Sequence, residues 1–98
     1  MQKEVALKII LAALGQSFAT RERARAIVHQ SAGCDARPIS LDISGVFVSP
    51  AFLAELLIAL TATNAVEVIG GHESHFNLEM ARKLVRQLAL DDLVSVLP

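Results

Sequence analysis

The chain has 98 residues, of which 53% are hydrophobic and 19% charged, so a disordered chain is excluded and one domain over residues 1–98 is expected. Its 9 basic and 10 acidic side chains leave a net charge of -1. That balance provides no general attraction for nucleic acid or anionic lipid. No apolar run approaches the roughly 18 uninterrupted residues of a membrane helix.

The cysteine content and the N-terminal stretch both bear on where the protein resides. Cys34 is the single cysteine and cannot form a disulfide within the chain, which fits a reducing cytoplasm. The first residues imitate a short secretory signal, but Glu4 and Lys8 fall inside the region that a signal keeps free of charges. We therefore expect a cytoplasmic protein without a cleaved signal.

The first part of the chain predicts two strands around one helix. Apolar residues alternate from Val5 to Leu11, which is typical of a strand. Thr20 is placed to cap a helix over residues 21–32. A second strand is expected over residues 39–43, where apolar and polar residues again alternate. The inward stripe of the helix is expected to be Ala24, Ile27, Val28 and Ser31.

The central segment predicts the most hydrophobic helix of the chain. Ser49 followed by Pro50 strongly indicates the start of a helix. Proline lacks a backbone N–H, and at the first helical position that N–H would have no partner within the helix. The helix is expected to run over residues 50–61. Its sheet-facing side is expected to consist of Phe52, Leu53, Leu56, Leu57 and Leu60.

The outward side of this helix carries few polar residues. Ala54, Ile58 and Ala59 remain for it, and Glu55 is the only charged residue of the helix. Exposed apolar strips of this kind mark protein interfaces. The alternative is that another element of the same domain covers the strip.

The last third of the chain predicts a strand, a helix and a final strand. A third strand is expected over residues 65–69, and Asn77 is expected to cap a third helix. The closing LVSVL is compatible with a strand or a helical tail, and we favour the strand. The chain is therefore expected to be an α/β domain with three helices and a mixed, mostly parallel sheet of about four strands. The inward stripe of the third helix is expected to be Leu78, Ala81, Leu84, Val85 and Leu88.

Two stretches, FATRERARAI (18–27) and LDISGVFVSPAFLAELL (41–57), resemble the STAS-like domain family, a bacterial group related to sulfate-transporter and anti-sigma-factor-antagonist domains. The leucine-rich C-terminal segment also resembles the C-terminal segment of ordinary anti-sigma-factor antagonists. The resemblance covers essentially the whole chain and implies a regulatory domain that binds a histidine-kinase-like ATPase or an anti-sigma-type regulator. The matching positions are Phe18, Thr20, Arg21, Glu22, Leu41, Asp42, Ser44, Gly45, Val46, Ser49, Phe52 and Glu55.

The phosphorylation switch of those antagonists does not carry over directly. In the relatives, an aspartate precedes the phosphorylated Ser or Thr, whereas this chain reads Ser49-Pro50-Ala51, with Ser49 nearer the aspartate position. Two interpretations of Ser49 stay open. It is a helix cap that contributes about 1 kcal/mol, or it is a phosphoacceptor that adds charge to a docking surface.

The residues expected to meet a protein partner are Arg21, Asp42, Ser49, Glu55 and Ile58. Arg21 and Glu55 would adjust charge complementarity with that partner, and Ile58 would supply apolar contact. The same apolar strip also suits a homodimer. Asp42 has a local alternative, which is to pair with Arg21 or to cap nearby amides.

Two further functions are alternatives to protein binding. The first is a small-ligand or nucleotide site at the strand ends, formed by Asp42, Ser44, Gly45 and His72. The second is a metal-dependent enzyme built on His72, Glu73 and His75, although His-x-x-His in a loop lacks the helical i, i+4 spacing of zinc motifs. The sequence contains no nucleophile elbow and no phosphate loop. We therefore expect neither enzymatic activity nor a cofactor or metal.

Overall fold

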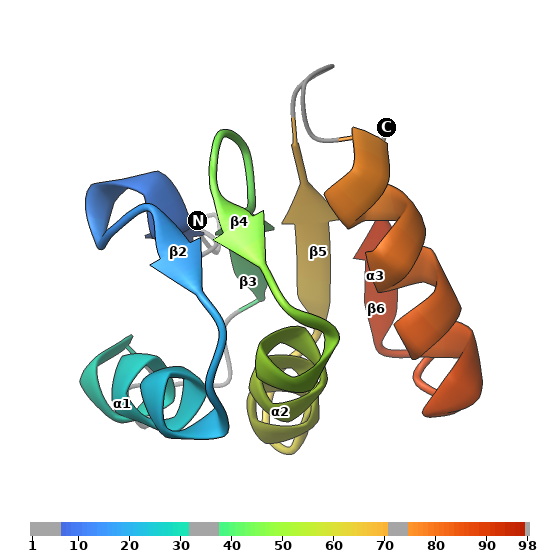
Figure 1. The fold of residues 1–98 in the computed structure, drawn as a ribbon. Coiled ribbons are helices and arrows are strands. Elements are labelled where there is room, and N and C mark those ends of the chain that lie inside the picture. The colour runs from blue at the N-terminus through green and yellow to red at the C-terminus, as the bar shows by residue number, and fades with distance from the viewer. Residues whose placement is uncertain (1–6, 32–37, 71–74, 98) are drawn as a thin grey trace, which may run out of the picture.

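The computed structural model describes residues 7–31, 38–70 and 75–97 (Figure 1). Within these residues the predicted α/β class, three α-helices and four-stranded sheet are confirmed. No helix in this part of the chain is both long enough and apolar enough to cross a membrane. The elements are β1 (Leu7–Ile10), the 3-10 helix η1 (Leu11–Ala13), β2 (Ser17–Phe18), α1 (Arg21–Ser31), β3 (Ile39–Asp42), β4 (Phe47–Val48), α2 (Pro50–Thr61), β5 (Val66–Ile69), α3 (His75–Gln87) and β6 (Val94–Val96).

The main sheet is parallel throughout its described strands, in the order β1-β3-β5-β6. Along the chain, an α-helix lies between each strand of the main sheet and the next one. The three α-helices lie in front of this sheet (Figure 1). With the strands in consecutive order and the helices on one face, the chain forms a right-handed superhelix, as parallel crossovers almost always do. The prediction of a mostly parallel sheet is confirmed, and all its described strand pairs are parallel.

A second, two-stranded sheet lies in front of the main one and was not predicted (Figure 1). Its strands β2 and β4 pair in parallel, with Ser17 opposite Phe47 and Phe18 opposite Val48. Because side chains alternate along a strand, Phe18 and Val48 point into the core while Phe47 points outward. The small sheet therefore leaves an aromatic ring on the surface.

The core lies between the helix-covered face of the main sheet, the small sheet and the helices. The predicted inward side of α2 is confirmed, since its five apolar residues are all buried. Phe52 stacks on Phe18 in a tilted arrangement with 5.2 Å between ring centroids. The fully buried large side chains are Phe18, Phe52, Leu11, Ile39, Leu41, Ile43, Leu53, Leu56, Leu57, Leu60, Val48 and Val68.

The opposite face of the main sheet carries the alternate residues of each strand. A row of polar side chains crosses it in register: Lys8, Ser40, Glu67 and Ser95. These side chains are exposed or half-buried. Leu97, whose amide donates to the carbonyl of Val68, is also partly exposed.

The start of α3 differs from the prediction. The helix begins at His75, two residues before Asn77, so Asn77 is not its cap. Asn77 is instead buried, and its Nδ2 donates a hydrogen bond of 2.8 Å to the carbonyl oxygen of Val46. The amide thus joins α3 to the turn between β3 and β4, which is a tertiary contact that local capping rules do not reveal.

The other observed boundaries of helices and strands agree with the predicted ones to within one or two residues. β1 ends at Ile10 because Leu11 enters the 3-10 turn, where it is still fully buried. Val5 and Ala32 lie outside the described residues. The closing segment is a strand, as favoured above.

Candidate functional site

The hydroxyl of Ser49 makes two hydrogen bonds at the start of α2. It accepts from the amide of Phe52 at 3.1 Å and donates to the carbonyl oxygen of Ala19 at 2.9 Å. The Ser49 amide in turn donates to the carbonyl of Phe18 at 2.9 Å. The helix-cap interpretation is confirmed. Phosphorylation stays a prediction, and it would remove the proton that the hydroxyl donates to Ala19.

Substitutions at Ser49 should separate these two bonds. Ser49→Ala loses both and should lower the free energy of unfolding by about 1–2 kcal/mol. Ser49→Asp keeps a good cap but cannot donate to the Ala19 carbonyl, so we expect an intermediate loss. Ser49→Thr keeps a hydroxyl that can both accept and donate these bonds, and it serves as the control. Urea denaturation followed by far-ultraviolet circular dichroism measures the series, and an aspartate variant as stable as wild type would contradict a stabilising Ala19 bond.

The outward side of α2 is apolar but narrower than predicted. Ile58 is 50% exposed, whereas Ala54 and Ala59 are half-buried. Ala51, two helical turns before Ile58, and Ala62, one turn after it at the end of the helix, are exposed. We call Ala51, Ala54, Ile58 and Ala62 the α2 outer surface. It is a shallow apolar strip with one large side chain at its centre.

Glu55 belongs to the contact between α1 and α2. Its Oε2 lies 3.5 Å from Nε of Arg25 on α1, and the two side chains are 28% and 61% exposed. The two helices pack side by side (Figure 1). Arg21, which was expected to meet a partner protein as Glu55 does, is exposed in the first turn of α1. The structure therefore pairs Glu55 with Arg25, and as a partly exposed pair it contributes little stability.

Helix α1 carries three arginines, Arg21, Arg23 and Arg25, and Arg23 has a structural role. The guanidinium of Arg23 donates to the carbonyl of Leu14 at 2.7 Å and lies 5.3 Å from the centroid of the Phe18 ring. The amide of Arg23 donates to the hydroxyl of Thr20, as expected for a helix cap. Two of the three arginines, Arg23 and Arg25, therefore contact segments next to α1.

Asp42 is used within its own turn. One carboxylate oxygen accepts a hydrogen bond of 2.9 Å from the amide of Ser44. Gly45 follows with φ +71°, a conformation that glycine adopts without steric cost. Of the two local alternatives for Asp42, the structure therefore shows the capping of a nearby amide. His72, the fourth residue of the expected ligand site, lies outside the described residues.

The candidate metal ligands of the alternative enzyme function are only partly placed. His72 and Glu73 lie outside the described residues, and His75 is the first residue of α3. Within the described ranges, no group of three or more His, Cys, Asp or Glu residues could hold a metal ion.

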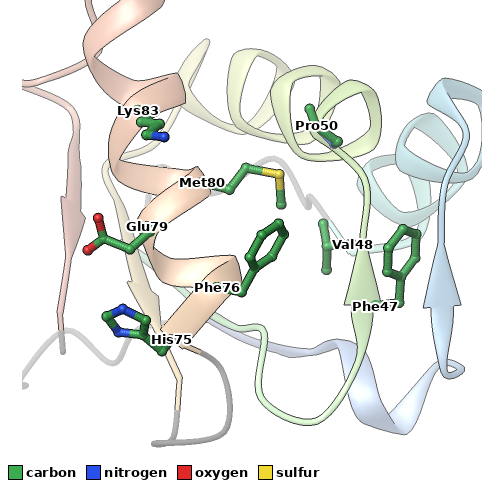
Figure 2. A pocket seen from close by; sticks show the side chains of 8 residues that line it. All are labelled: Phe47, Val48, Pro50, His75, Phe76, Glu79, Met80 and Lys83. Atoms are coloured by element: carbon green, nitrogen blue, oxygen red, sulfur yellow. The ribbon is translucent and has the colours of Figure 1, made fainter.

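A groove of about 600 Å³ opens beside the start of α2. Figure 2 shows Phe76 and Met80 of α3 pointing toward β4, which supplies the facing wall. Phe47 is 57% exposed and Phe76 is 76% exposed. This groove was not predicted from the sequence. Two adjacent apolar residues, Phe47 and Val48, indicate only that one of them points outward if they form a strand. The lining residues are Phe47, Val48, Pro50, His75, Phe76, Glu79, Met80 and Lys83.

Comparison with known proteins found no family model that matches the chain, and no curated protein or solved structure that matches it. The STAS-like resemblance therefore depends on the sequence motifs alone.

Proposed function

We propose that the chain is a non-enzymatic regulatory domain that binds another protein through the α2 outer surface. The observation that carries this proposal is the exposure of Ile58, a large apolar side chain that is half-accessible on a helix whose other side forms the domain core. Alanines flank it, so a partner can approach the helix closely. Large apolar side chains within accessible, uncharged strips are typical of protein contacts.

The partner class follows from the resemblance to anti-sigma-factor antagonists. It would be a histidine-kinase-like ATPase or an anti-sigma-type regulator in bacterial signalling. Ser49 lies at one end of the α2 outer surface and the Arg25–Glu55 pair borders it. A phosphate on Ser49 would add negative charge at that end and would weaken binding to an acidic partner.

The substitution Ile58→Asp tests the surface directly. It places a charge at the centre of the proposed contact, so binding to a purified histidine-kinase-like ATPase of the host should weaken at least tenfold. Isothermal titration calorimetry provides the measurement. Because Ile58 is exposed, the free energy of unfolding should change by no more than about 0.5 kcal/mol.

The matched control is Leu97→Asp, which makes the same kind of change on the far face of the main sheet. It should bind the ATPase as wild type does. Equal affinity of wild type and Ile58→Asp would contradict the proposal. Unfolding of Ile58→Asp would show that Ile58 belongs to the core, and the milder Ile58→Ser would then decide between the two roles.

A further inference from the structure

The groove between α3 and β4 has the size and the lining of a small-molecule site. Its volume is about 600 Å³, and such sites occupy roughly 300–1,000 Å³. Its lining is mostly apolar. The floor includes Val48, which is buried, and Met80, which is half-buried, and the exposed rings of Phe47 and Phe76 border it on the two sides (Figure 2).

The two walls of the groove are joined by a hydrogen bond from a buried amide. Nδ2 of Asn77 donates to the carbonyl oxygen of Val46 at 2.8 Å. Asn77 follows Phe76 on α3, and Val46 precedes Phe47 at the start of β4. The bond therefore holds the α3 wall and the β4 wall in a defined relation, so the groove is formed before any ligand binds.

The groove carries a positive charge that the described residues do not compensate. Glu79 is paired with Arg82 on its own helix, and Figure 2 shows Glu79 pointing away from β4. Lys83 also lines the groove, and it forms no ion pair with any residue that the structure describes. An apolar groove with an uncompensated ammonium group favours an apolar molecule that carries a negative charge.

The positive charge lies toward one end of the groove. Phe76, Met80 and Lys83 have the i, i+4 and i+7 spacing of residues on one helical face. This face of α3 changes from apolar to charged over about 10 Å along the helix axis. Figure 2 shows Lys83 near the level of Pro50, with the rings of Phe47 and Phe76 further along the groove. A ligand with a charged head and an apolar tail matches this order.

We propose that the groove binds a free amphiphilic anion of the size of a medium-chain fatty acid. The carboxylate pairs with the ammonium group of Lys83, and the acyl chain lies over Met80 and Val48 between the two phenylalanine rings. A protein partner would need a larger surface, because a standard interface buries about 800 Å² per partner. The inference does not depend on the proposed function, since no residue of the α2 outer surface lines the groove.

An NMR titration of the backbone amides with decanoate tests the site. Decanoate should shift the amide signals of Val48 and Met80 until they saturate. Because the rings beside the floor are largely exposed, the groove encloses only part of the chain, and we expect a dissociation constant of about 0.1–1 mM. Decylamine has the same chain length and the opposite charge, and it should bind at least tenfold more weakly. Both probes are kept below the concentrations at which they form micelles.

A charge reversal tests the role of Lys83. Lys83→Glu should invert the preference, so that decylamine binds more tightly than decanoate. The control Arg86→Glu makes the same reversal on α3 outside the groove lining, and it should keep the wild-type preference. Because the two variants have the same net charge, a difference between them reports the groove and not the charge of the whole protein.

A second substitution tests the apolar part of the groove. Phe76→Asp removes one bordering ring and adds a negative charge, so decanoate should bind at least tenfold more weakly. Leu97→Asp makes the same kind of change on the far face of the main sheet, and it should bind decanoate as wild type does. Ile58→Asp should also bind decanoate normally, which separates this inference from the proposed function.

Three results would overturn the inference. The first is the absence of a saturable shift with decanoate. The second is equal affinity of the wild-type chain for decanoate and decylamine, since the groove would then not select charge. The third is a groove that another protein chain covers: a ligand-free dimer in sedimentation equilibrium that Phe76→Asp dissociates, or binding to the histidine-kinase-like ATPase that Phe76→Asp abolishes.

Discussion

Replacing Phe52 with alanine should lower the free energy of unfolding by about 3–5 kcal/mol. The Phe52 side chain is fully buried, and its ring packs on Phe18 at a centroid distance of 5.2 Å. The alanine variant loses the transfer free energy of the ring and leaves a cavity between α2 and the small sheet. Because a domain of this size is stable by only about 5–15 kcal/mol, the variant should be partly unfolded at 37 °C.

Urea denaturation followed by far-ultraviolet circular dichroism measures this loss. Phe76→Ala is the matched control, since it removes the same ring at a position that is 76% exposed, and its effect should stay within about 0.5 kcal/mol. Should Phe52→Ala not fold at all, Phe52→Leu should still lose more stability than the control. Equal stability of the two alanine variants would contradict the assignment of Phe52 to the core.

The Phe18–Phe52 contact itself can be isolated by a double-mutant cycle. Phe18→Leu and Phe52→Leu each keep an apolar side chain but remove the ring stacking. The double variant should lose less stability than the two single variants together, by about 0.5–1.5 kcal/mol, because the ring pair is lost only once.

The parts of the fold that depend on local sequence were predicted well. Ser49 and Pro50 define the start of α2 because capping and the proline ring act within one helical turn. The inward side of α2 follows from the helical repeat of its leucines. The β6 strand follows from the alternating LVSVL segment. In each case the information lies within a few residues of the element.

The small sheet was missed because its strands are too short to show a period. β2 and β4 form because the amide of Phe47 donates to the carbonyl of Gln16, and the amide of Ser49 donates to that of Phe18. These bonds join residues that lie about 30 positions apart. That pairing decides that Phe47 and not Val48 lies on the surface. Local patterns indicate neither this choice nor the position of α3 across the groove.

The Arg25–Glu55 ion pair was not predicted, for the same reason. Several arginines of α1 are available to Glu55, and the packing of α1 on α2 sets which turn of α1 faces it. The choice between arginines one turn apart depends on helix rotation, which composition and spacing do not fix. The expectation that Arg21 and Glu55 adjust charge complementarity with a partner stays a prediction.

The buried amide of Asn77 provides the second large expected effect. Asn77→Ala should lower the free energy of unfolding by about 1–3 kcal/mol, because it removes the buried Nδ2 donor and leaves the half-buried Val46 carbonyl without this bond. Urea denaturation followed by far-ultraviolet circular dichroism measures the loss.

Asn77→Asp distinguishes the hydrogen bond from the shape of the side chain. At neutral pH the carboxylate cannot donate to the Val46 carbonyl and is costly to bury, so the loss should exceed that of Asn77→Ala. Burial would raise the pKa of the new carboxyl above its unfolded value, and the destabilisation should therefore shrink as the pH falls through that raised pKa and the protonated acid donates again. The control Gln16→Glu, an exposed amide changed to a carboxylate, should show no such recovery. An aspartate variant as stable as wild type at neutral pH would contradict the role assigned to this bond.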